Sequence, residues 1–448
     1  MSDVDVVVVG LGPGGEAVAT QLGQAGLDVV AVDRRLVGGE CPYYACVPTK
    51  MMVRGSDVLA EGRRIPDYAG SSTVTSDWGP VHVRIRDEAT ADWDDQVAVE
   101  RLQKAGVTFV RGEARLTGPR QVEVDGTTYT ARRGVVLNTG TEPATPPIEG
   151  LAGTPYWTNR DISRLDELPG SLLVIGGGPV GLEIVQTFAR FGVEVTVLES
   201  SERLLAPEEP ESSALLAGVL EDEGIRVLTG VTISAVSYGD GQFSVQVDGQ
   251  TLQADRLLVA AGRRTNLAGL GLDAVGLDPD ARVIEVDPHL RAADGLWALG
   301  DITGKGGFTH VSMYQSAIVV RDILKRDGPE ASYHAVPHVT FTDPEVGSVG
   351  MTERQARDAG LNVRVATTDL GSSTRGWIHR SPGLIKLVED ADRGVLVGAT
   401  SVGPTGGEVL SMLVTAVHAE VPTDTLRSMI YAYPTFHRAV EDALSKLA

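Results

Sequence analysis

One short pattern occurs twice in this sequence, and the duplication restricts the possible folds more than any other feature. Each copy has an apolar stretch, a glycine-rich turn, a helix-length segment, a second apolar stretch and an acidic residue. In residues 4–33 the turn reads GLGPGG and the acidic residue is Asp33; in residues 172–199 the turn reads GGGPVG and the acidic residue is Glu199. The acidic residue stands 23 positions after the first glycine in both copies. This arrangement is typical of a β-α-β unit that binds a dinucleotide.

Each residue type in the pattern has a physical reason. The first glycine makes the turn, the second lets the backbone approach a pyrophosphate, and the third allows the helix to pack on the strand. The helix N-terminus offers free N–H groups to the phosphates, and the acidic side chain accepts hydrogen bonds from a ribose. Because both copies follow an apolar strand, we interpret them as two dinucleotide sites and not as chance turns. The predicted contacts are Gly10, Gly12, Pro13, Gly14, Gly15, Asp33 and Arg34 in the first site, and Gly176, Gly178, Pro179, Val180, Gly181 and Glu199 in the second.

The composition excludes several classes of partner. The 448 residues carry a formal charge of −21, dispersed along the chain, so nucleic acid and anionic membrane surfaces would repel the protein. The apolar stretches are only strand-length, and the N-terminus is acidic where a secretion signal would be basic. We therefore expect a cytoplasmic protein of two or three domains without membrane spans.

Only two cysteines are present, Cys41 and Cys46. A reducing compartment disfavours a structural disulfide between them. Two thiols alone cannot complete a four-ligand zinc site, so we predict no metal site. The residues themselves leave two interpretations open: a redox pair, or two unrelated core cysteines.

The run GGECPYYACVPTK, residues 38–50, resembles the redox motif of the pyridine nucleotide–disulfide oxidoreductases. That family includes dihydrolipoamide dehydrogenase, glutathione and mycothione reductases and mercuric reductase. Its pattern is Gly-Gly-x-Cys, a second cysteine five positions on, and then Pro-Ser/Thr-Lys. The resemblance covers essentially the whole chain. It includes Thr139-Gly140, Glu183 in the second unit, and residues 262–266, 300–301 and 341–353.

The resemblance implies that the first site binds FAD and the second a nicotinamide cofactor, with electrons passing through the flavin to a Cys41–Cys46 disulfide. Cys46 is then the thiolate in contact with the flavin, and Cys41 is the thiol that attacks the substrate. Lys50 is implied to lie near the flavin, paired with Glu183. A lysine and a helix N-terminus lower a thiol pKa, as a thiolate nucleophile requires. Further residues implied to contact a cofactor are Gly39, Glu40, Ala114, Thr139, Gly140, Gly262, Arg263, Gly300, Asp301, Thr309 and His310.

Together these features predict an α/β fold with two doubly wound Rossmann-like nucleotide-binding domains and a C-terminal α+β dimerisation domain. We expect residues 1–150 and 277–332 to form a discontinuous FAD-binding domain, with residues 151–276 inserted as the NAD(P)-binding domain. Residues 333–448 contain no dinucleotide motif and are expected to form the dimerisation domain of a two-fold symmetric homodimer.

The choice of nicotinamide cofactor depends on Glu199. An ionised carboxylate accepts a hydrogen bond from a free 2′-hydroxyl but repels a 2′-phosphate, which favours NADH. Arg203, four residues on, is long enough to reach a 2′-phosphate unless it is an ordinary loop residue. NADPH therefore stays open as a second donor.

The C-terminal segment departs from the family pattern. The family carries His-Pro-Thr-x-x-Glu, whose histidine reaches the partner's active site as an acid–base group, but this chain has Tyr433 and Arg438 in those positions. Tyrosine, with an ordinary pKa of about 10, is a poor base at neutral pH, although it can donate a proton. His437 is a second candidate, set against its interpretation as an exposed helix residue.

The cysteine loop also departs from the family pattern, because Tyr43, Tyr44 and Ala45 stand where an asparagine and a glycine are usual within the loop. The two tyrosine rings either gate the pocket and stack on a planar substrate, or simply pack. No third cysteine exists to hand over a metal, which argues against mercury as the substrate.

Three functions follow from these observations. The leading one is an NADH-dependent flavoprotein disulfide reductase with an unusual substrate, such as a disulfide with a good leaving thiol. The second is direct reduction of a quinone or another diffusible acceptor from the flavin. The third is a nucleotide-binding protein that senses redox state. The missing histidine–glutamate dyad motivates the third, whereas the retained Cys41, Cys46 and Lys50 favour the first.

Overall fold

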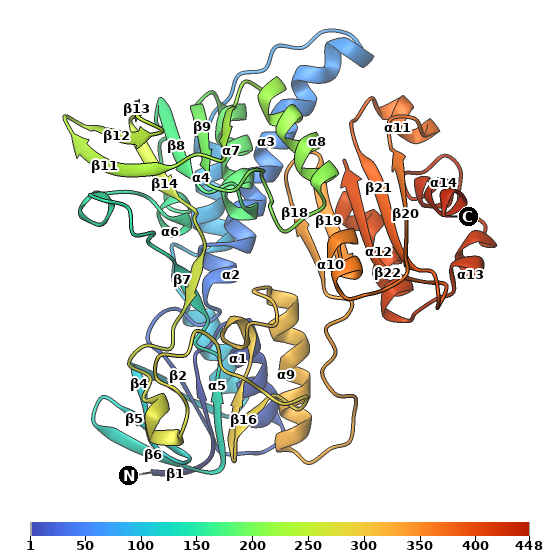
Figure 1. Ribbon diagram of the computed structural model, residues 1–448. Coiled ribbons are helices and arrows are strands. Elements are labelled where there is room, and N and C mark those ends of the chain that lie inside the picture. The colour runs from blue at the N-terminus through green and yellow to red at the C-terminus, as the bar shows by residue number, and fades with distance from the viewer. Residues whose placement is uncertain (1, 448) are drawn as a thin grey trace.

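The first glycine turn lies at the end of a central strand in an eight-stranded sheet. The structure is a computed structural model that describes residues 2–447 (Figure 1). The main path of the sheet is β16 (Arg291–Ala293), β17 (Leu296–Ala298), β6 (Thr127–Leu137), β1 (Ser2–Val9), β2 (Val29–Asp33) and β3 (Val107–Arg111). All strands from β17 to β3 run parallel. The valines at positions 6–9 are all buried, as expected for a parallel strand that is covered on both faces.

Two separate cores cover this sheet. On one face, α1 (Pro13–Gln24), α5 (Gln96–Lys104) and α9 (Thr309–Ile323) pack over the side chains of Val6 and Val8. On the other face, the antiparallel pair β4 (Ala114–Gly118) and β5 (Gln121–Val124) and the short turn η3 (Leu272–Val275) pack over Val7 and Val9. The alternation of these valines between two cores follows from the two-residue period of a strand.

The second glycine turn follows one of the two inner strands of a four-stranded parallel sheet. The order is β10 (Arg226–Thr229), β9 (Glu194–Glu199), β8 (Ser171–Ile175) and β14 (Arg256–Val259). The helices α7 (Pro179–Phe191) and α8 (Pro210–Asp222) contribute to the core on one face. The antiparallel strands β11 (Ile233–Gly239), β12 (Gln242–Val247) and β13 (Gln250–Ala254) pack on the other face around the buried Phe243.

Two short strands join the first and second sheets. β7 (Thr141–Pro143) leaves the first sheet and β15 (Arg263–Thr265) returns to it, and the two pair antiparallel (Figure 1). The second sheet is thus formed by a segment inserted between two strands of the first.

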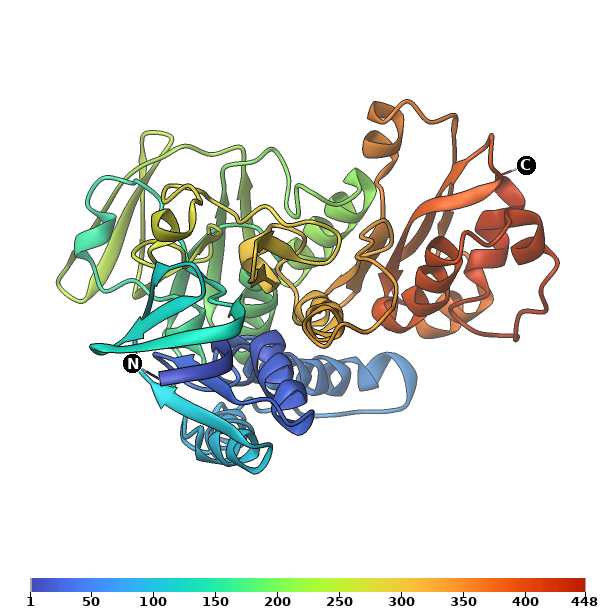
Figure 2. The same cartoon turned by 90° about the horizontal axis from the view of Figure 1, so that it is seen from below.

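The C-terminal segment forms an antiparallel sheet of its own. Its order is β18 (Pro337–Thr340), β19 (Glu345–Gly350), β22 (Val395–Gly403), β21 (Leu384–Asp390) and β20 (Val363–Asp369). Other elements of this segment are α10 (Glu353–Asp358), α11 (Thr374–His379), α12 (Gly406–His418), α13 (Thr423–Arg427) and α14 (Ala439–Lys446). Figures 1 and 2 show this orange and red part on one side of the molecule.

A buried charge cluster ties the C-terminal sheet to the second unit. Lys386 on β21 is only 2 % exposed and contacts Glu209, Glu211 and Glu353 at 2.9 to 3.0 Å. Because an unpaired buried ammonium is very costly, its pairing with Glu209 and Glu211 holds the start of α8 against this sheet.

The helix α3 (Cys46–Tyr68) runs from the cysteine loop along α7 of the second unit. It follows the one-turn helix α2 (Glu40–Tyr43). The middle of α3 is anchored by Asp57, which accepts a hydrogen bond from the buried Arg190 of α7 at 2.8 Å. Arg190 also contacts Glu223 and Asp343, so one side chain joins all three parts of the chain.

The helix prediction for His437 is wrong. The segment from Tyr433 to Arg438 is irregular, and α14 begins only at Ala439. Pro434 lacks a backbone N–H, which disfavours a helix there. Between residues 2 and 447, no helix combines the length and apolar character needed to cross a membrane.

Candidate active site

A cavity of about 1010 Å³ is lined by both cysteines and by residues of both glycine-turn units and of the C-terminal sheet. The sequence-predicted residues that line it are Gly10, Gly12, Pro13, Asp33, Arg34, Gly39, Glu40, Cys41, Cys46, Lys50, Ala114, Thr139, Gly140, Pro179, Val180, Glu183, Arg263, Gly300, Asp301, Thr309 and His310. The other predicted residues do not line it, namely Gly14, Gly15, Gly176, Gly178, Gly181, Glu199, Gly262, Tyr433 and His437.

The third glycine of each unit is required for packing. A Cβ atom on Gly15 would lie 2.0 Å from the carbonyl oxygen of Gly10, and one on Gly181 would lie 2.6 Å from that of Gly176. Neither position therefore accepts a side chain, and each helix approaches its strand closely. This is the packing role that the sequence pattern predicts.

The second glycine leaves the start of each helix open. A Cβ on Gly12 meets only the amide nitrogen of Asn138, at 3.3 Å, and one on Gly178 meets no described atom within 4 Å. Both helices begin with a proline directly afterwards, and neither N-cap glycine offers a side-chain hydrogen bond. The first N–H groups are thus available to an anion, and the residues fit the pyrophosphate of a dinucleotide.

Asp33 holds the first glycine turn in place. Its two carboxylate oxygens accept backbone hydrogen bonds from Leu11 and Arg35, both at 2.7 Å. Burial raises the pKa of Asp33, and the two hydrogen bonds oppose that shift. The side chain lines the cavity at the end of β2, where a ribose would lie in a unit of this type.

Glu199 has the same geometry in the second unit. It accepts backbone hydrogen bonds from Gly177 and Ser201, both at 2.6 Å. Burial raises the pKa of Glu199, but these bonds outweigh it and the net shift is downward, so the group is ionised at neutral pH. Arg203 does not extend toward solvent, because its guanidinium donates to the carbonyl oxygens of Ala206 and Glu208.

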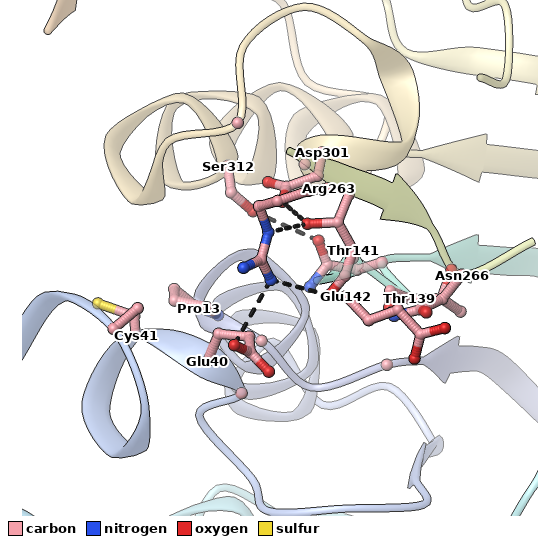
Figure 3. Close-up of a pocket in the computed structure, with 18 of the residues that line it drawn as sticks. Pro13, Glu40, Cys41, Thr139, Thr141, Glu142, Arg263, Asn266, Asp301 and Ser312 are labelled. Carbon is pink, nitrogen blue, oxygen red and sulfur yellow. Dashed lines mark hydrogen bonds and ion pairs between the residues drawn. The ribbon is translucent and has the colours of Figure 1, made fainter. Parts of the chain in front are cut away.

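A chain of polar contacts crosses the middle of the cavity (Figure 3). Thr141 donates to Asp301 at 2.6 Å and accepts a hydrogen bond from Arg263 at 2.7 Å. Arg263 lies 3.4 Å from Glu40, which in turn accepts a hydrogen bond from Arg160 at 2.6 Å. These contacts join the strands β7 and β15 to the helix α2, which carries Glu40 and Cys41. They also place the guanidinium groups of Arg263 and Arg160 beside the cavity.

The two cysteines are thiols in this structure and lie at the junction of α2 and α3. Cys41 is on α2 (Figure 3), and Cys46 is the first residue of α3, with its sulfur 3.5 Å from the hydroxyl of Thr309. The hydrogen bond from Cys41 is the main cause that lowers the pKa of Cys46 from an ordinary 9.0 to about 6. Burial opposes the shift, and Thr309 and Lys50 add to it. The same contact raises the pKa of Cys41, so the pair carries its negative charge on Cys46.

Lys50 and Glu183 form an ion pair between α3 and α7. The ammonium contacts the two carboxylate oxygens at 2.9 and 2.7 Å, and the glutamate side chain is only 4 % exposed. The backbone N–H of Phe341, just after β18, donates to the same carboxylate at 2.9 Å, and the ammonium lies 4.6 Å from the Phe341 ring centre. Because Lys50 follows Cys46 by four residues on one helix, the ammonium and the thiolate belong to one rigid element.

The two tyrosines of the cysteine loop have different environments. Tyr43 is buried, and its carbonyl oxygen accepts a hydrogen bond from the indole of Trp93 at 3.1 Å. Tyr44 lines the cavity, with the guanidinium of Arg164 5.8 Å from its ring centre and Arg160 at 6.0 Å. Tyr43 is thus a packing residue, whereas Tyr44 is available to a ligand.

The chain matches the profile of the pyridine nucleotide-disulphide oxidoreductases over residues 4–317, and that of their dimerisation domain over residues 336–444. The chain belongs to this family. It is 33 % identical to dihydrolipoyl dehydrogenase of Thermus scotoductus, over 100 % of this chain and 98 % of the relative. It is also 33 % identical to mercuric reductase of Streptomyces lividans, over 98 % of this chain and 94 % of the relative.

Two solved structures resemble this chain over its whole length. The Cu(II) complex of the HOCl-induced flavoprotein disulfide reductase RclA from Escherichia coli superposes with a TM-score of 0.88 at 26 % identity, covering 100 % of both chains. LpdA from Mycobacterium tuberculosis gives a TM-score of 0.87 at 25 % identity, also over 100 % of both chains. The predicted fold class is confirmed: two Rossmann-like nucleotide-binding folds and a C-terminal dimerisation domain.

Membership of the pyridine nucleotide-disulphide oxidoreductases establishes the general activity. The protein is an NAD(P)H-dependent flavoprotein disulfide oxidoreductase that uses FAD, and it forms a homodimer. Electrons pass from NAD(P)H through FAD to a redox disulfide, for which this chain has only Cys41 and Cys46.

The family's acid–base position lies outside this chain's own cavity. Tyr433 is 65 % exposed, and its hydroxyl donates to Thr374 on α11 at 3.2 Å. The guanidinium of Arg438 lies 5.3 Å from the tyrosine ring centre. His437 is half-buried, with its ring 6.2 Å from that of Tyr431. Of the two candidates, Tyr433 is the more accessible to a second subunit.

The sequence-based prediction missed several cavity residues. Thr141, Arg160 and His338 line the cavity, and each lies 2.6 Å from a carboxylate oxygen, of Asp301, Glu40 and Glu208 respectively. Thr141 directly follows the predicted Thr139-Gly140 pair, so its position was the one available signal. Arg160 and His338 belong to no recognised motif and reach the cavity only through the packing of distant segments.

Proposed function

We propose that this protein transfers electrons from NADH to a small-molecule disulfide through Cys41 and Cys46. The observation that carries the proposal is the joint placement of Cys46 and Lys50 on the first turns of α3, with Lys50 paired to the buried Glu183. FAD, when bound, supplies the chemistry that couples a two-electron donor to a dithiol. The lowered pKa of Cys46 keeps that sulfur as a thiolate at neutral pH.

Each nucleotide has its own set of residues. The turn at Gly12 and Pro13 and the carboxylate of Asp33 would hold the FAD, with Asp301 and Thr141 at the middle of the cavity. The nicotinamide cofactor would take the turn of the second unit, with Val180 facing the cavity and Glu199 on the ribose; residues 151–276 would form that domain. Residues 1–150 with 277–332 would form the FAD domain and residues 333–448 the dimerisation domain.

Cys41 is the sulfur that attacks the substrate. Its sulfur gives up the thiol proton as it displaces one sulfur of the substrate disulfide, so that the first product leaves as a thiol with that proton and a mixed disulfide forms. The Cys46 thiolate then attacks the Cys41 sulfur, which releases the second product as a thiolate that solvent protonates, and restores the Cys41–Cys46 disulfide. Because the proton of the pair resides on Cys41, this proton is the one available to the first leaving thiol.

The partner's Tyr433 would complete this proton transfer. A phenol is a poor base at neutral pH but a competent hydrogen-bond donor, so it suits a substrate whose leaving thiol is already acidic. The exposed position of Tyr433 on the dimerisation domain supports this assignment over His437. We propose that the protein is cytoplasmic, because a reducing compartment disfavours a permanent structural disulfide and so leaves the two cysteines available as a redox pair.

Anaerobic titration with NADH tests the proposal directly. We expect a long-wavelength charge-transfer band to develop at two-electron reduction, because the Cys46 thiolate would then face oxidised flavin. The visible spectrum of the purified holoenzyme is the measurement. Bleaching of the flavin without that band would show that the cysteine pair is not in electronic contact with it, and would contradict the proposed route.

The Glu199→Gln variant tests the choice of cofactor. We expect kcat/KM with NADPH to rise relative to kcat/KM with NADH by about tenfold or more, since the repulsion of a 2′-phosphate is removed. Steady-state kinetics with both cofactors measure the ratio. Glu199→Asp keeps the charge and is the control; equal ratios in the wild type and both variants would refute an NADH preference set by this carboxylate.

A further inference from the structure

Two guanidinium groups lie near the exposed Tyr433 of the dimerisation domain. That of Arg438 lies 5.3 Å from the Tyr433 ring centre, and that of Arg375, on α11, lies 5.5 Å from the Phe436 ring centre. The Tyr433 hydroxyl donates a hydrogen bond to Thr374, the residue before Arg375. Both arginines thus belong to the surroundings of one exposed tyrosine, and we call Arg375 and Arg438 the arginine pair.

The positive charge of the arginine pair is only partly neutralised. Arg438 forms an ion pair with Glu441 at 3.0 Å, yet 38 % of its side chain stays exposed. Arg375 is half-buried and forms no ion pair with a carboxylate within residues 2–447. A guanidinium has five N–H donors, so donors remain for a ligand. The family pattern has a glutamate at the position of Arg438, so the sign of the charge beside the acid–base position is reversed in this chain.

The arginine pair does not serve the cavity of its own chain. Neither arginine lines that cavity, and neither does Tyr433. Figure 1 shows α11 and α14 on the outer side of the orange and red part, away from α2. Tyr433 occupies the position that reaches the partner's active site in this family, and the protein forms a homodimer. Residues in contact with Tyr433 accompany it to that site, where the substrate meets the partner's Cys41.

We propose that the arginine pair of one subunit binds an anionic group of the disulfide that the partner's Cys41 attacks. The substrate class is then a disulfide that carries a carboxylate or a similar anion. This inference rests on the proposed function and adds the substrate class to it. A guanidinium holds a carboxylate by two parallel N–H···O bonds, which fix its orientation as well as its charge. The arginines make and break no covalent bond; they position the substrate for exchange at Cys41.

Two aromatic disulfides with acidic leaving thiols separate charge from reactivity. Dithiobis(nitrobenzoate) is a dianion, and dipyridyl disulfide is neutral. In the Arg438→Gln holoenzyme at saturating NADH, we expect kcat/KM for the dianion to fall about tenfold or more, mainly through KM, because a charged hydrogen bond is lost. The neutral disulfide should stay within about twofold. Arg375→Gln should act in the same direction, and Arg393→Gln, which removes an exposed arginine paired with Glu420 in the same domain, is the control.

The salt dependence has a sign that the arginine pair decides. If only the overall charge of −21 acted on the dianion, added salt would screen a repulsion and raise kcat/KM. A cationic site reverses this, so we expect wild-type kcat/KM for the dianion to fall between about 0.02 and 0.5 M NaCl. In the double variant Arg375→Gln/Arg438→Gln the dianion should be reduced faster as salt is added. The ratio to the neutral disulfide removes any effect of salt on the NADH step.

Mixed dimers test whether Arg438 acts across the interface. A dimer of one Cys41→Ser subunit and one Arg438→Gln subunit has a single intact cysteine pair, in the Arg438→Gln subunit. The Cys41→Ser subunit supplies that site with its own Arg438. We expect the wild-type preference for the dianion, with one working site in place of two. Loss of the preference would show that Arg438 acts within its own chain, and would overturn the assignment to the partner's site.

Three further results would overturn the inference. They are an equal loss of kcat/KM for both disulfides in Arg438→Gln, which marks a structural role, a rise of the dianion's kcat/KM with salt in the wild type, and an unchanged preference for the dianion in the double variant. If the wild type reduced neither disulfide, the proposed function would fail. Reduction of dipyridyl disulfide together with an unchanged preference in the double variant would overturn this inference alone.

Discussion

The Cys41→Ser protein is expected to lose at least about a thousandfold of its disulfide reductase activity and to gain a long-wavelength absorption band at rest. Without Cys41 no disulfide forms, so the Cys46 sulfur remains a thiolate beside oxidised flavin. The serine hydroxyl still donates a hydrogen bond to Cys46, which keeps the main cause of its lowered pKa. Steady-state kinetics and the visible spectrum of the oxidised protein measure the two effects.

The band has a predictable pH dependence. A group whose pKa is lowered in the folded protein stays ionised down to that pKa, so the band should be constant near neutral pH and fade as the pH decreases through about 6. A cysteine at its ordinary 9.0 would instead show the band only in alkaline solution. The matched control is Cys46→Ser, which should show no band at any pH. A band of equal strength in both variants would exclude Cys46 as its source.

The Lys50→Met protein is expected to lose about a hundredfold of its NADH-dependent turnover and to melt at a lower temperature. The substitution leaves the Glu183 carboxylate buried without its ammonium partner, which costs about 2 kcal/mol because the lysine side of the pair is partly exposed. Methionine retains the length and apolar stem of lysine, so packing against Phe341 changes little. Stopped-flow reduction by NADH and thermal denaturation are the measurements.

The double variant Lys50→Met/Glu183→Leu separates the two effects. With both charges removed, no buried carboxylate is left unpaired, so we expect the melting temperature to recover while the turnover stays low. Recovery of turnover in the double variant would mean that Lys50 only neutralises Glu183. A melting temperature that falls further would mean that the pair is needed for packing.

Much of the nucleotide architecture was predictable because it is encoded locally. The spacing of Gly10, Gly15 and Asp33 lies within a single β-α-β unit, and the structure shows Asp33 bonded across the turn it accompanies. The Cys46–Lys50 spacing is likewise one helical turn. In such cases the periodicity of a strand or helix fixes which side chains share a face.

The residues that the sequence did not reveal depend on contacts between distant segments. Glu208 and His338 are 130 positions apart, and they meet only because β18 packs beside the second unit. Arg160 reaches Glu40 across 120 positions. Trp93 is a different case: it has a left-handed backbone, with φ of 57°, which tryptophan rarely adopts and which no local pattern predicts. Its indole contact with Tyr43 shows what holds it there.

The two sulfurs lie on either side of a helix boundary, so they differ in how far each can move during the redox cycle. Cys46 is the first residue of the 23-residue helix α3, which Arg190 anchors at Asp57. Cys41 lies on the one-turn helix α2, which is followed by the irregular residues Tyr44 and Ala45. Breaking a disulfide requires the two sulfurs to separate, and a long anchored helix resists displacement more than a short loop. When the disulfide opens and closes, Cys41 would therefore move while Cys46 stays in place. Cys41, which meets the substrate, is the residue that moves. Cys46, which receives the electrons, stays aligned.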